Sequence, residues 1–159
     1  ASNVGKHTPA NIPIIPFVHY NTTATPKEGA PKDLVPMSER AYQELLWHAL
    51  LRGHDTLAMW CPRKELAQEA RLVQAVYADS LEFKEFLQKG TPLLFDVPKP
   101  AGVIKKQPPP IVSAVKLGNK LLVRRTDFTD SKRKVTIEVD GKKIKVERKD
   151  GACQVIELK

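Results

Sequence analysis

Two short segments in the first half of the chain are almost continuously apolar. Residues 12–20 contain two prolines and are too short for a helix, and residues 55–60 follow a helical segment after only a few positions. Continuous apolarity over such lengths is typical of strands that are buried on both faces of a parallel sheet. A buried strand that comes directly after a helix is also the usual connection within such a sheet. We therefore predict that the two segments are parallel strands.

Two helices are predicted to follow these strands. Ser38 is a good N-cap for the first helix, and Gly53 suits the left-handed position just after its end. One face of that helix is predicted to be buried through a stripe of apolar residues: Tyr42, Leu45, Leu46, Ala49 and Leu50. The second helix is predicted to begin at Pro62 and to end at Gly90, with apolar residues at intervals of three to five: Leu66, Ala70, Val73, Tyr77, Leu81 and Phe86. The order of elements is therefore β-α-β-α.

Beyond a proline-rich stretch at residues 98–110, the spacing of the apolar residues changes from the helical interval to every second residue. Prolines are disfavoured in helices and in central strands, so this stretch is the best candidate boundary in the chain. After it, apolar residues alternate with polar ones, and turn signals such as Asp140-Gly141 and Asp150-Gly151 separate the runs. About five short strands with such turns favour a small antiparallel β-sandwich or barrel.

Charge is distributed unevenly along the chain. Residues 1–98 carry 10 Lys and Arg against 11 Asp and Glu, whereas residues 99–159 carry 16 against 7. Two basic clusters, at residues 132–134 and 142–145, would attract phosphates. However, the lysines in the strands alternate with Val and Ile, and only Phe128 offers an aromatic ring for base stacking. The pattern favours a solvated sheet face over nucleic-acid binding.

Side chains at the strand ends are the first candidates for function, because the working residues of parallel α/β folds lie where strands end and loops begin. His19 and Tyr20 take this position after the first strand, and Trp60 takes it after the second. The imidazole of His19 can act as a general base or as a hydrogen-bond donor to a substrate hydroxyl. The rings of Tyr20 and Trp60 can stack on a sugar, and they can equally cap the hydrophobic core. We take these three residues as candidate substrate contacts.

A complete catalytic or metal-binding constellation is not visible. Neither strand end supplies the two carboxylates that glycosidic hydrolysis needs, and the sequence contains no Ser-His-Asp order, phosphate loop or Walker motif. His48 and His54 have no third ligand at metal spacing, and Cys61 and Cys153 match no metal or dense disulfide pattern. We therefore predict no catalytic residue, metal or cofactor in this chain. No apolar run approaches the ~20 residues of a membrane span, so no membrane partner is predicted either.

Three segments together resemble the last two strand–helix units of TIM-barrel glycoside hydrolases. They are residues 14–20, 42–53 and 56–61. In such enzymes the seventh strand is often a proline-bearing apolar run. The eighth follows a helix that ends in Arg-Gly, and it often finishes in a sugar-binding tryptophan, which corresponds to Trp60 here. A β-sandwich packed on the barrel is also common in these families.

The resemblance implies a fold and a domain division. Residues 1–90 would be the closing β-α-β-α units of a (β/α)8-type barrel, and residues 91–159 would be a β-sandwich domain. Eight strands close a barrel and this segment supplies two. The implied partners are therefore a carbohydrate and the remaining strand–helix units, in the same polypeptide or in another chain.

The function implied by the resemblance is that of a carbohydrate-active enzyme whose catalytic acids lie outside this chain. Many of these enzymes carry a glutamate nucleophile at the end of the seventh strand, where this chain has His19-Tyr20. The chain alone would then be inactive. A carbohydrate substrate favours an extracellular or periplasmic location, which the sequence itself leaves open. The alternative is a non-enzymatic binding module whose basic β-domain engages an anionic polymer.

Overall fold

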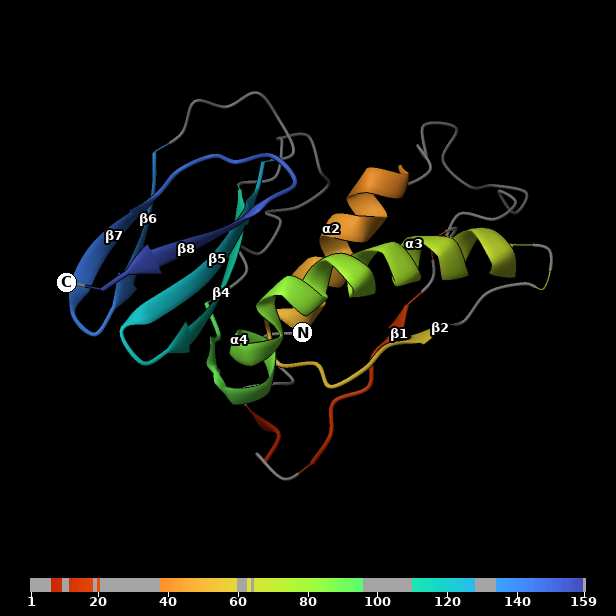
Figure 1. Ribbon diagram of the computed structural model, residues 1–159, viewed down its shortest axis with the longest axis horizontal. Helices are drawn as coiled ribbons and strands as arrows, with labels where there is room; N and C mark the ends of the chain where they lie inside the picture. The colour runs from red at the N-terminus through yellow and green to blue at the C-terminus, as the bar shows by residue number, and fades with distance from the viewer. Residues whose placement is uncertain are drawn as a thin grey trace, which may run out of the picture.

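The computed structural model describes residues 7–9, 12–18, 20, 38–59, 63, 65–95, 110–127 and 134–158. Strand β1 (Phe17–Val18) and strand β2 (Ala58–Met59) pair in parallel, with helix α2 (Glu39–Leu50) between them in sequence and helix α3 (Leu66–Ser80) after them. Figure 1 shows both strands on the far side of the helices from the antiparallel strands of the second half. The predicted β-α-β-α order and the parallel pairing are therefore confirmed.

Helix α2 begins and ends as its sequence predicts. The Ser38 side chain accepts a hydrogen bond from the Ala41 N–H at 3.1 Å, and Gly53 adopts a φ of 77° just beyond the last turn. The predicted apolar stripe is only partly buried, because Leu45 is exposed while Trp47, outside the stripe, is buried. Helix α2 packs against α3 on one side and against the antiparallel sheet on another. Its buried surface is therefore wider than a single stripe.

The second helical segment is divided and buries a different face from the one predicted. After α3 come a 3₁₀ turn (Leu81–Phe83) and a short helix α4 (Lys84–Lys89), which ends at Gly90 as predicted. Several of the predicted apolar positions, Tyr77 among them, are exposed, and the buried residues of α3 are Glu69, Leu72, Val76 and Ser80. A buried carboxylate and a buried serine break the apolar period, so the period indicated the wrong face. The predicted start at Pro62 lies outside the described residues. In the described part of the chain, no helix has the length and apolar character to cross a membrane.

The described residues of the second half form two antiparallel sheets. All five predicted strands are present: β4 (Ile111–Leu117), β5 (Lys120–Thr126), β6 (Val135–Val139), β7 (Lys142–Val146) and β8 (Cys153–Glu157). Strand β3 (Thr91–Leu93) is absent from the prediction; it precedes the proline-rich stretch and pairs with β4 beyond it. One sheet has the order β3-β4-β5-β8, and the other consists of β6 and β7.

An apolar core joins the two sheets. Buried residues from both of them form one cluster: Val112, Ala114, Leu121, Val123, Ile137, Val139 and Val146. Asp140 and Gly141 close the hairpin between β6 and β7 with φ angles of 52° and 74°, as the Asp-Gly signal predicts. Two antiparallel sheets around one core are compatible with the small sandwich expected from the sequence.

A polar stripe of α2 connects the two halves of the chain. Glu44 and His48 of α2 and Arg52 in the turn just after it follow one another at intervals of four residues, and all three are buried. Glu44 accepts two hydrogen bonds from the Arg124 guanidinium of β5, at 2.8 and 2.9 Å. Arg52 donates to two backbone carbonyls, at 3.2 and 3.0 Å. Helix α2 is thus fixed to the antiparallel sheet by charged and polar contacts.

The parallel strand pair leaves large apolar side chains at the surface. Phe17 of β1 is 74% exposed, and Ile12, Ile15 and Met59 are also exposed, whereas Val18 is buried. The prediction that these strands are buried on both faces is therefore wrong for Phe17 within this chain. Because both faces of a parallel sheet are normally covered, the pair presents an uncovered apolar face.

The Glu44–Arg124 pair gives a direct test of the connection between the two halves. Glu44→Leu leaves the buried Arg124 guanidinium without its carboxylate, so we expect the free energy of unfolding to fall by about 3–5 kcal/mol. Replacing both residues by leucine removes both charges and should cost much less than the sum of the two single changes. Urea denaturation of the three variants measures these differences.

An exposed ion pair between α2 and α3 is the matched control. Arg71→Leu breaks the surface pair with Glu39 and should cost less than about 1 kcal/mol. If Glu44→Leu proves no more costly than Arg71→Leu, the buried pair does not hold the two halves together.

Candidate functional site

Of the three predicted substrate contacts, the structure places Tyr20, while His19 and Trp60 lie outside the described residues. Tyr20 is half-buried just after β1. Its ring lies against that of Tyr42, with centroids 5.4 Å apart and planes at 58°. Its backbone N–H donates to Glu69 Oε1 at 3.1 Å. Tyr20 is therefore held at the end of β1 by contacts with α2 and α3.

The first turns of both long helices gather at the end of the layer where β1 and β2 finish. Tyr42 in α2 and Glu69 in α3 both contact Tyr20, and the Tyr42 hydroxyl donates to Glu69 at 2.5 Å. At the start of α2, Glu39 accepts a hydrogen bond from Arg71 of α3 at 2.7 Å. Ligand sites of parallel α/β folds form at this end. We call it the strand-exit end.

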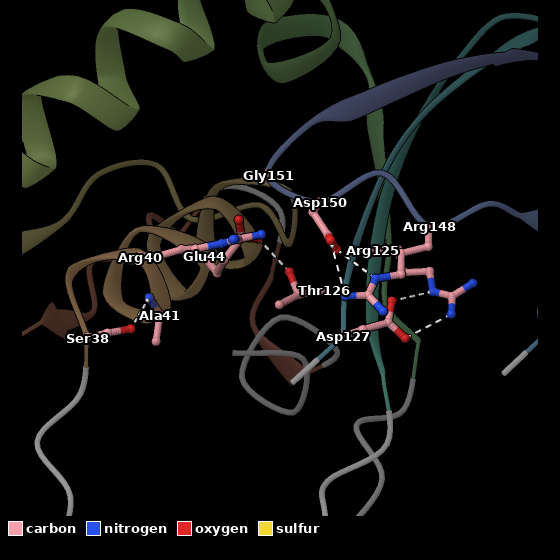
Figure 2. Close-up of a pocket in the computed structure, with 10 residues that line it drawn as sticks. All are labelled: Ser38, Arg40, Ala41, Glu44, Arg125, Thr126, Asp127, Arg148, Asp150 and Gly151. Carbon is pink, nitrogen blue, oxygen red and sulfur yellow. Dashed lines mark hydrogen bonds and ion pairs between the residues drawn. The ribbon is translucent and has the colours of Figure 1, made fainter. Parts of the chain in front are cut away.

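A cleft of about 350 Å³ lies between the first turns of α2 and the antiparallel strands. Figure 2 shows its walls, with α2 on one side and β5 and the turn before β8 on the other. The residues that line it are Ser38, Arg40, Ala41, Glu44, Arg125, Thr126, Asp127, Arg148, Asp150 and Gly151. Three of these side chains are positive and three are negative. We call it the strand-exit cleft.

Most charges in the strand-exit cleft are fixed in forked ion pairs. Arg125 donates from Nε and Nη2 to the two carboxylate oxygens of Asp127, at 2.7 and 2.8 Å. Arg148 binds Asp150 in the same way, at 2.8 and 3.1 Å. Bidentate pairs of this kind hold both side chains in one geometry. Arg40 differs, since no hydrogen bond to a described residue fixes its guanidinium, and its positive charge helps to lower the pKa of Asp150 across the cleft.

A directed chain of hydrogen bonds runs from the cleft into the interior behind it. Thr126 Oγ1 donates to Glu44 Oε2 at 2.5 Å, so its oxygen accepts from His48 Nε2 at 2.8 Å. His48 Nδ1 is then the acceptor of the ring, and the Ser113 hydroxyl donates to it at 2.8 Å. Ser113 Oγ in turn accepts from Arg52 Nε at 2.7 Å. This chain is complete when His48 is neutral with its proton on Nε2.

Burial and these contacts set the charges beside the cleft. Burial lowers the pKa of His48 to about 4, so the imidazole is neutral near pH 7. Burial alone would raise the pKa of Glu44, but hydrogen bonds, chiefly from Arg124, outweigh it and hold that pKa below its usual value. A hydrogen bond from Arg148 lowers the pKa of Asp150 as well. At neutral pH both carboxylates are therefore ionised and the histidine is uncharged.

These protonation states suit binding rather than acid–base catalysis. A general acid must carry a proton near the working pH, and the carboxyl groups of Glu44 and Asp150 do not. In the described ranges, no group of three His, Cys, Asp or Glu side chains could hold a metal ion. Cys153 is a free thiol whose pKa is raised by burial, which disfavours the reactive thiolate. The described side chains of the cleft can therefore fix a polar ligand in a defined direction.

None of the six charged residues of the strand-exit cleft is among the candidates predicted from the sequence. The two forked pairs do share a signal, because Arg125 precedes Asp127 by two positions and Arg148 precedes Asp150 by two. Side chains two apart in an extended chain point to the same side, so this spacing indicates paired charges. Arg40 carries no such signal. It lines the cleft only because α2 packs beside the sheet.

Comparisons with known proteins identify no family for this chain. No protein-family model matches it, and searches of curated proteins and of solved structures found no match. A function is therefore inferred from the residues at the strand-exit end.

The neutral state of His48 predicts a loss of stability in acid. The unfolded chain takes up a proton near the ordinary pKa of 6.5, whereas the folded chain resists protonation until about pH 4. The free energy of unfolding should be highest above pH 6.5 and should fall by up to about 3 kcal/mol as the pH decreases to 4. Denaturant titrations across this range measure the slope.

His48→Gln is the matched variant, because an amide can donate and accept in the same chain without titrating. Its stability should depend less steeply on pH between 6.5 and 4. His54, whose pKa is also lowered by burial, keeps part of the slope in this variant. An undiminished slope in His48→Gln would assign the acid sensitivity to another group.

Proposed function

We propose that this chain is the C-terminal part of a carbohydrate-active, glycoside hydrolase-like protein. Residues 1–90 supply the last two strand–helix units of a (β/α)8-type barrel, and residues 91–159 form a β-sandwich beside them. The observation that carries the proposal is the parallel pairing of β1 and β2, with α2 between them in sequence and the first turns of α2 and α3 at the strand ends. Barrel enzymes bind their ligands at this end.

The strand-exit end offers the chemical groups that a sugar needs. His19, Tyr20 and Trp60 follow β1 and β2 in the sequence, and they are the proposed substrate contacts. The strand-exit cleft is lined by the first turn of α2, which begins at the same end. Its paired guanidinium and carboxylate groups can donate to and accept from sugar hydroxyls in fixed directions. A polyhydroxylated ligand would thus find aromatic faces and polar groups together.

The catalytic acids of the proposed enzyme lie outside this chain. Among the described residues of the cleft, Glu44 and Asp127 are buried in ion pairs with Arg124 and Arg125. A buried carboxylate held by a guanidinium is not free to approach a glycosidic oxygen. We therefore expect the chain alone to bind carbohydrate without hydrolysing it.

The uncovered apolar face of the parallel strands supports the participation of further strand–helix units. Ile15, Phe17 and Met59 are exposed on or beside β1 and β2. Neighbouring parallel strands and their helices would remove these side chains from water, as in other parallel sheets. These units are the proposed macromolecular partner, in the same polypeptide or in another chain.

Polymer binding separates the proposed function from the polyanion-binding alternative. The chain is sedimented with insoluble polysaccharides, and its binding to heparin and DNA is measured in parallel. Each assay is run at two salt concentrations. Retention by a polysaccharide at both salt concentrations is the expected result. Binding only to heparin and DNA, and loss of that binding at the higher salt, would instead identify a basic module for anionic polymers. The arginines of this half favour the first outcome, because Arg124, Arg125 and Arg148 are each paired with a carboxylate.

The two tryptophans predict opposite responses to truncation. Trp60→Ala should weaken binding to a retained polysaccharide by about 1–3 kcal/mol, the loss typical of an aromatic anchor, with little change in folding stability. Trp47 is 4% exposed and packs against Arg124, so Trp47→Ala should cost about 3–5 kcal/mol of stability. Denaturant midpoints and binding isotherms of both variants make the comparison. A large stability loss in Trp60→Ala with unchanged sugar affinity would remove Trp60 from the binding surface.

From the uncovered face of the parallel strands we predict that the isolated chain exposes an apolar patch that binds hydrophobic molecules. Phe17→Ser should reduce the binding of a hydrophobic dye while changing the stability of the isolated chain by no more than about 0.5 kcal/mol. Leu66→Ser, which changes an exposed leucine on α3, is the control and should leave dye binding unchanged. Native mass spectrometry and limited proteolysis complete the test. A protease-resistant monomer that binds no dye would argue against missing strand–helix units.

A further inference from the structure

A second cavity lies at the opposite end of the parallel layer, where α2 ends and β2 begins. Its volume is about 420 Å³, which falls within the range of ordinary small-molecule sites. The C-terminal ends of α2 and α3, helix α4 and the strands β3 and β4 contribute to its walls. Polar groups of the lining come from His54, Asp55, Lys84 and Gln88, and an aromatic ring comes from Tyr77. We call it the distal cavity.

His54 is buried in the wall of this cavity, and its ring nitrogens have no hydrogen-bond partner among the described residues. It is 8% exposed, and neither ring nitrogen forms a hydrogen bond with any described residue. Burial lowers its pKa, so the ring is neutral at pH 7, with one N–H donor and one acceptor nitrogen. A buried polar group without a partner is costly. A ligand hydroxyl, which can both donate and accept, would supply a bond to either nitrogen.

Three further side chains of the distal cavity have hydrogen-bonding capacity to spare. Lys84 and Gln88 are four positions apart on α4 and therefore lie on one face, and neither has a partner among the described residues. Asp55 accepts the Ile14 N–H through Oδ2 at 2.8 Å, which leaves Oδ1 for a ligand. The charges of Lys84 and Asp55 balance. The lining therefore suits a neutral ligand with several hydroxyl groups better than an anion.

Tyr77 adds a flat apolar surface to these polar groups. Its side chain lines the cavity and is 64% exposed, although a tyrosine on a packed helix usually buries its ring. The Ser80 hydroxyl donates to the Tyr77 carbonyl at 2.7 Å within the same turn. An exposed aromatic face beside unpaired donors and acceptors matches a sugar ring, which has a C–H face and a rim of hydroxyls.

We propose that the distal cavity binds one neutral pyranose unit of a glycan, with the C–H face of the sugar on Tyr77 and its hydroxyls on His54, Asp55 and Gln88. The kind of ligand rests on the proposed carbohydrate function. The place does not, because the distal cavity and the strand-exit cleft share no lining residue. A second contact would hold a long polysaccharide at two points of the chain and raise its overall affinity.

Affinity electrophoresis of the full chain in gels that contain galactomannan, xylan or β-glucan tests the distal cavity. Tyr77→Ala should weaken retention by about tenfold in at least one of these gels, whereas Tyr77→Phe should stay within about twofold of the parent chain. His54→Phe keeps an aromatic ring and removes both nitrogens, so it should weaken retention while leaving the unfolding temperature unchanged or higher. The imidazole ¹⁵N shifts of His54 should also move when mannotetraose, xylotetraose or cellotetraose, matching the retaining polymer, is added.

Trp60→Ala distinguishes a failure at this cavity from a failure of the proposed function. If Tyr77→Ala and His54→Phe leave retention unchanged while Trp60→Ala abolishes it, the distal site is overturned and the strand-exit proposal stands. If only the Tyr77 and His54 variants lose retention, the result supports the distal site and contradicts the strand-exit contacts. Retention of the parent chain by none of the three polymers would contradict the distal site.

Discussion

Three polar side chains from α2 and the turn just after it can be buried against a β-sheet only because each of them finds a partner there. Glu44 is bound by an arginine, His48 is bridged between two hydroxyls, and Arg52 donates to a hydroxyl and two carbonyls. A buried charge without a partner costs several kcal/mol, so a placement of α2 that separated Glu44 from Arg124, or Arg52 from its acceptors, would be strongly disfavoured. We infer that this stripe fixes how α2 is placed on the sheet, whatever its net contribution to stability.

The position of α2 in turn determines where ligands can bind. Its other buried face carries Tyr42 and Leu46 into the core that α3 and β1 share. Its first turn lines the strand-exit cleft, and its last turn contributes Leu50 to the distal cavity. The two candidate sites therefore lie at opposite ends of one helix. A change that weakens the buried stripe is expected to disturb both of them, whereas a change at Tyr77 or at Arg40 should disturb one.

Elements defined by local signals could be predicted from the sequence, and contacts between distant elements could not. The Ser38 cap and the Asp140-Gly141 hairpin depend on residues that are close together in the chain, and each parallel strand is a short apolar run, although the two strands pair across a long separation. The buried face of α3 was missed because Glu69 is satisfied by tyrosines from other elements, which no apolar period reveals. The same applies to the cleft, whose charged walls come from helix and strands more than eighty positions apart. The sandwich and the barrel units stay predictions, as do the roles of His19, Tyr20 and Trp60.

The central claim is that carbohydrate binds where the parallel strands end. Hydrogen–deuterium exchange of the whole chain, measured with and without a polysaccharide that retains it, tests this claim most directly. We predict slower exchange in residues 17–20 and 58–63 when the polymer is present, because a bound sugar would cover both strand ends. Unchanged exchange in these segments, with protection confined to the lysine-rich hairpin of β6 and β7, would contradict the claim and favour an anionic-polymer module.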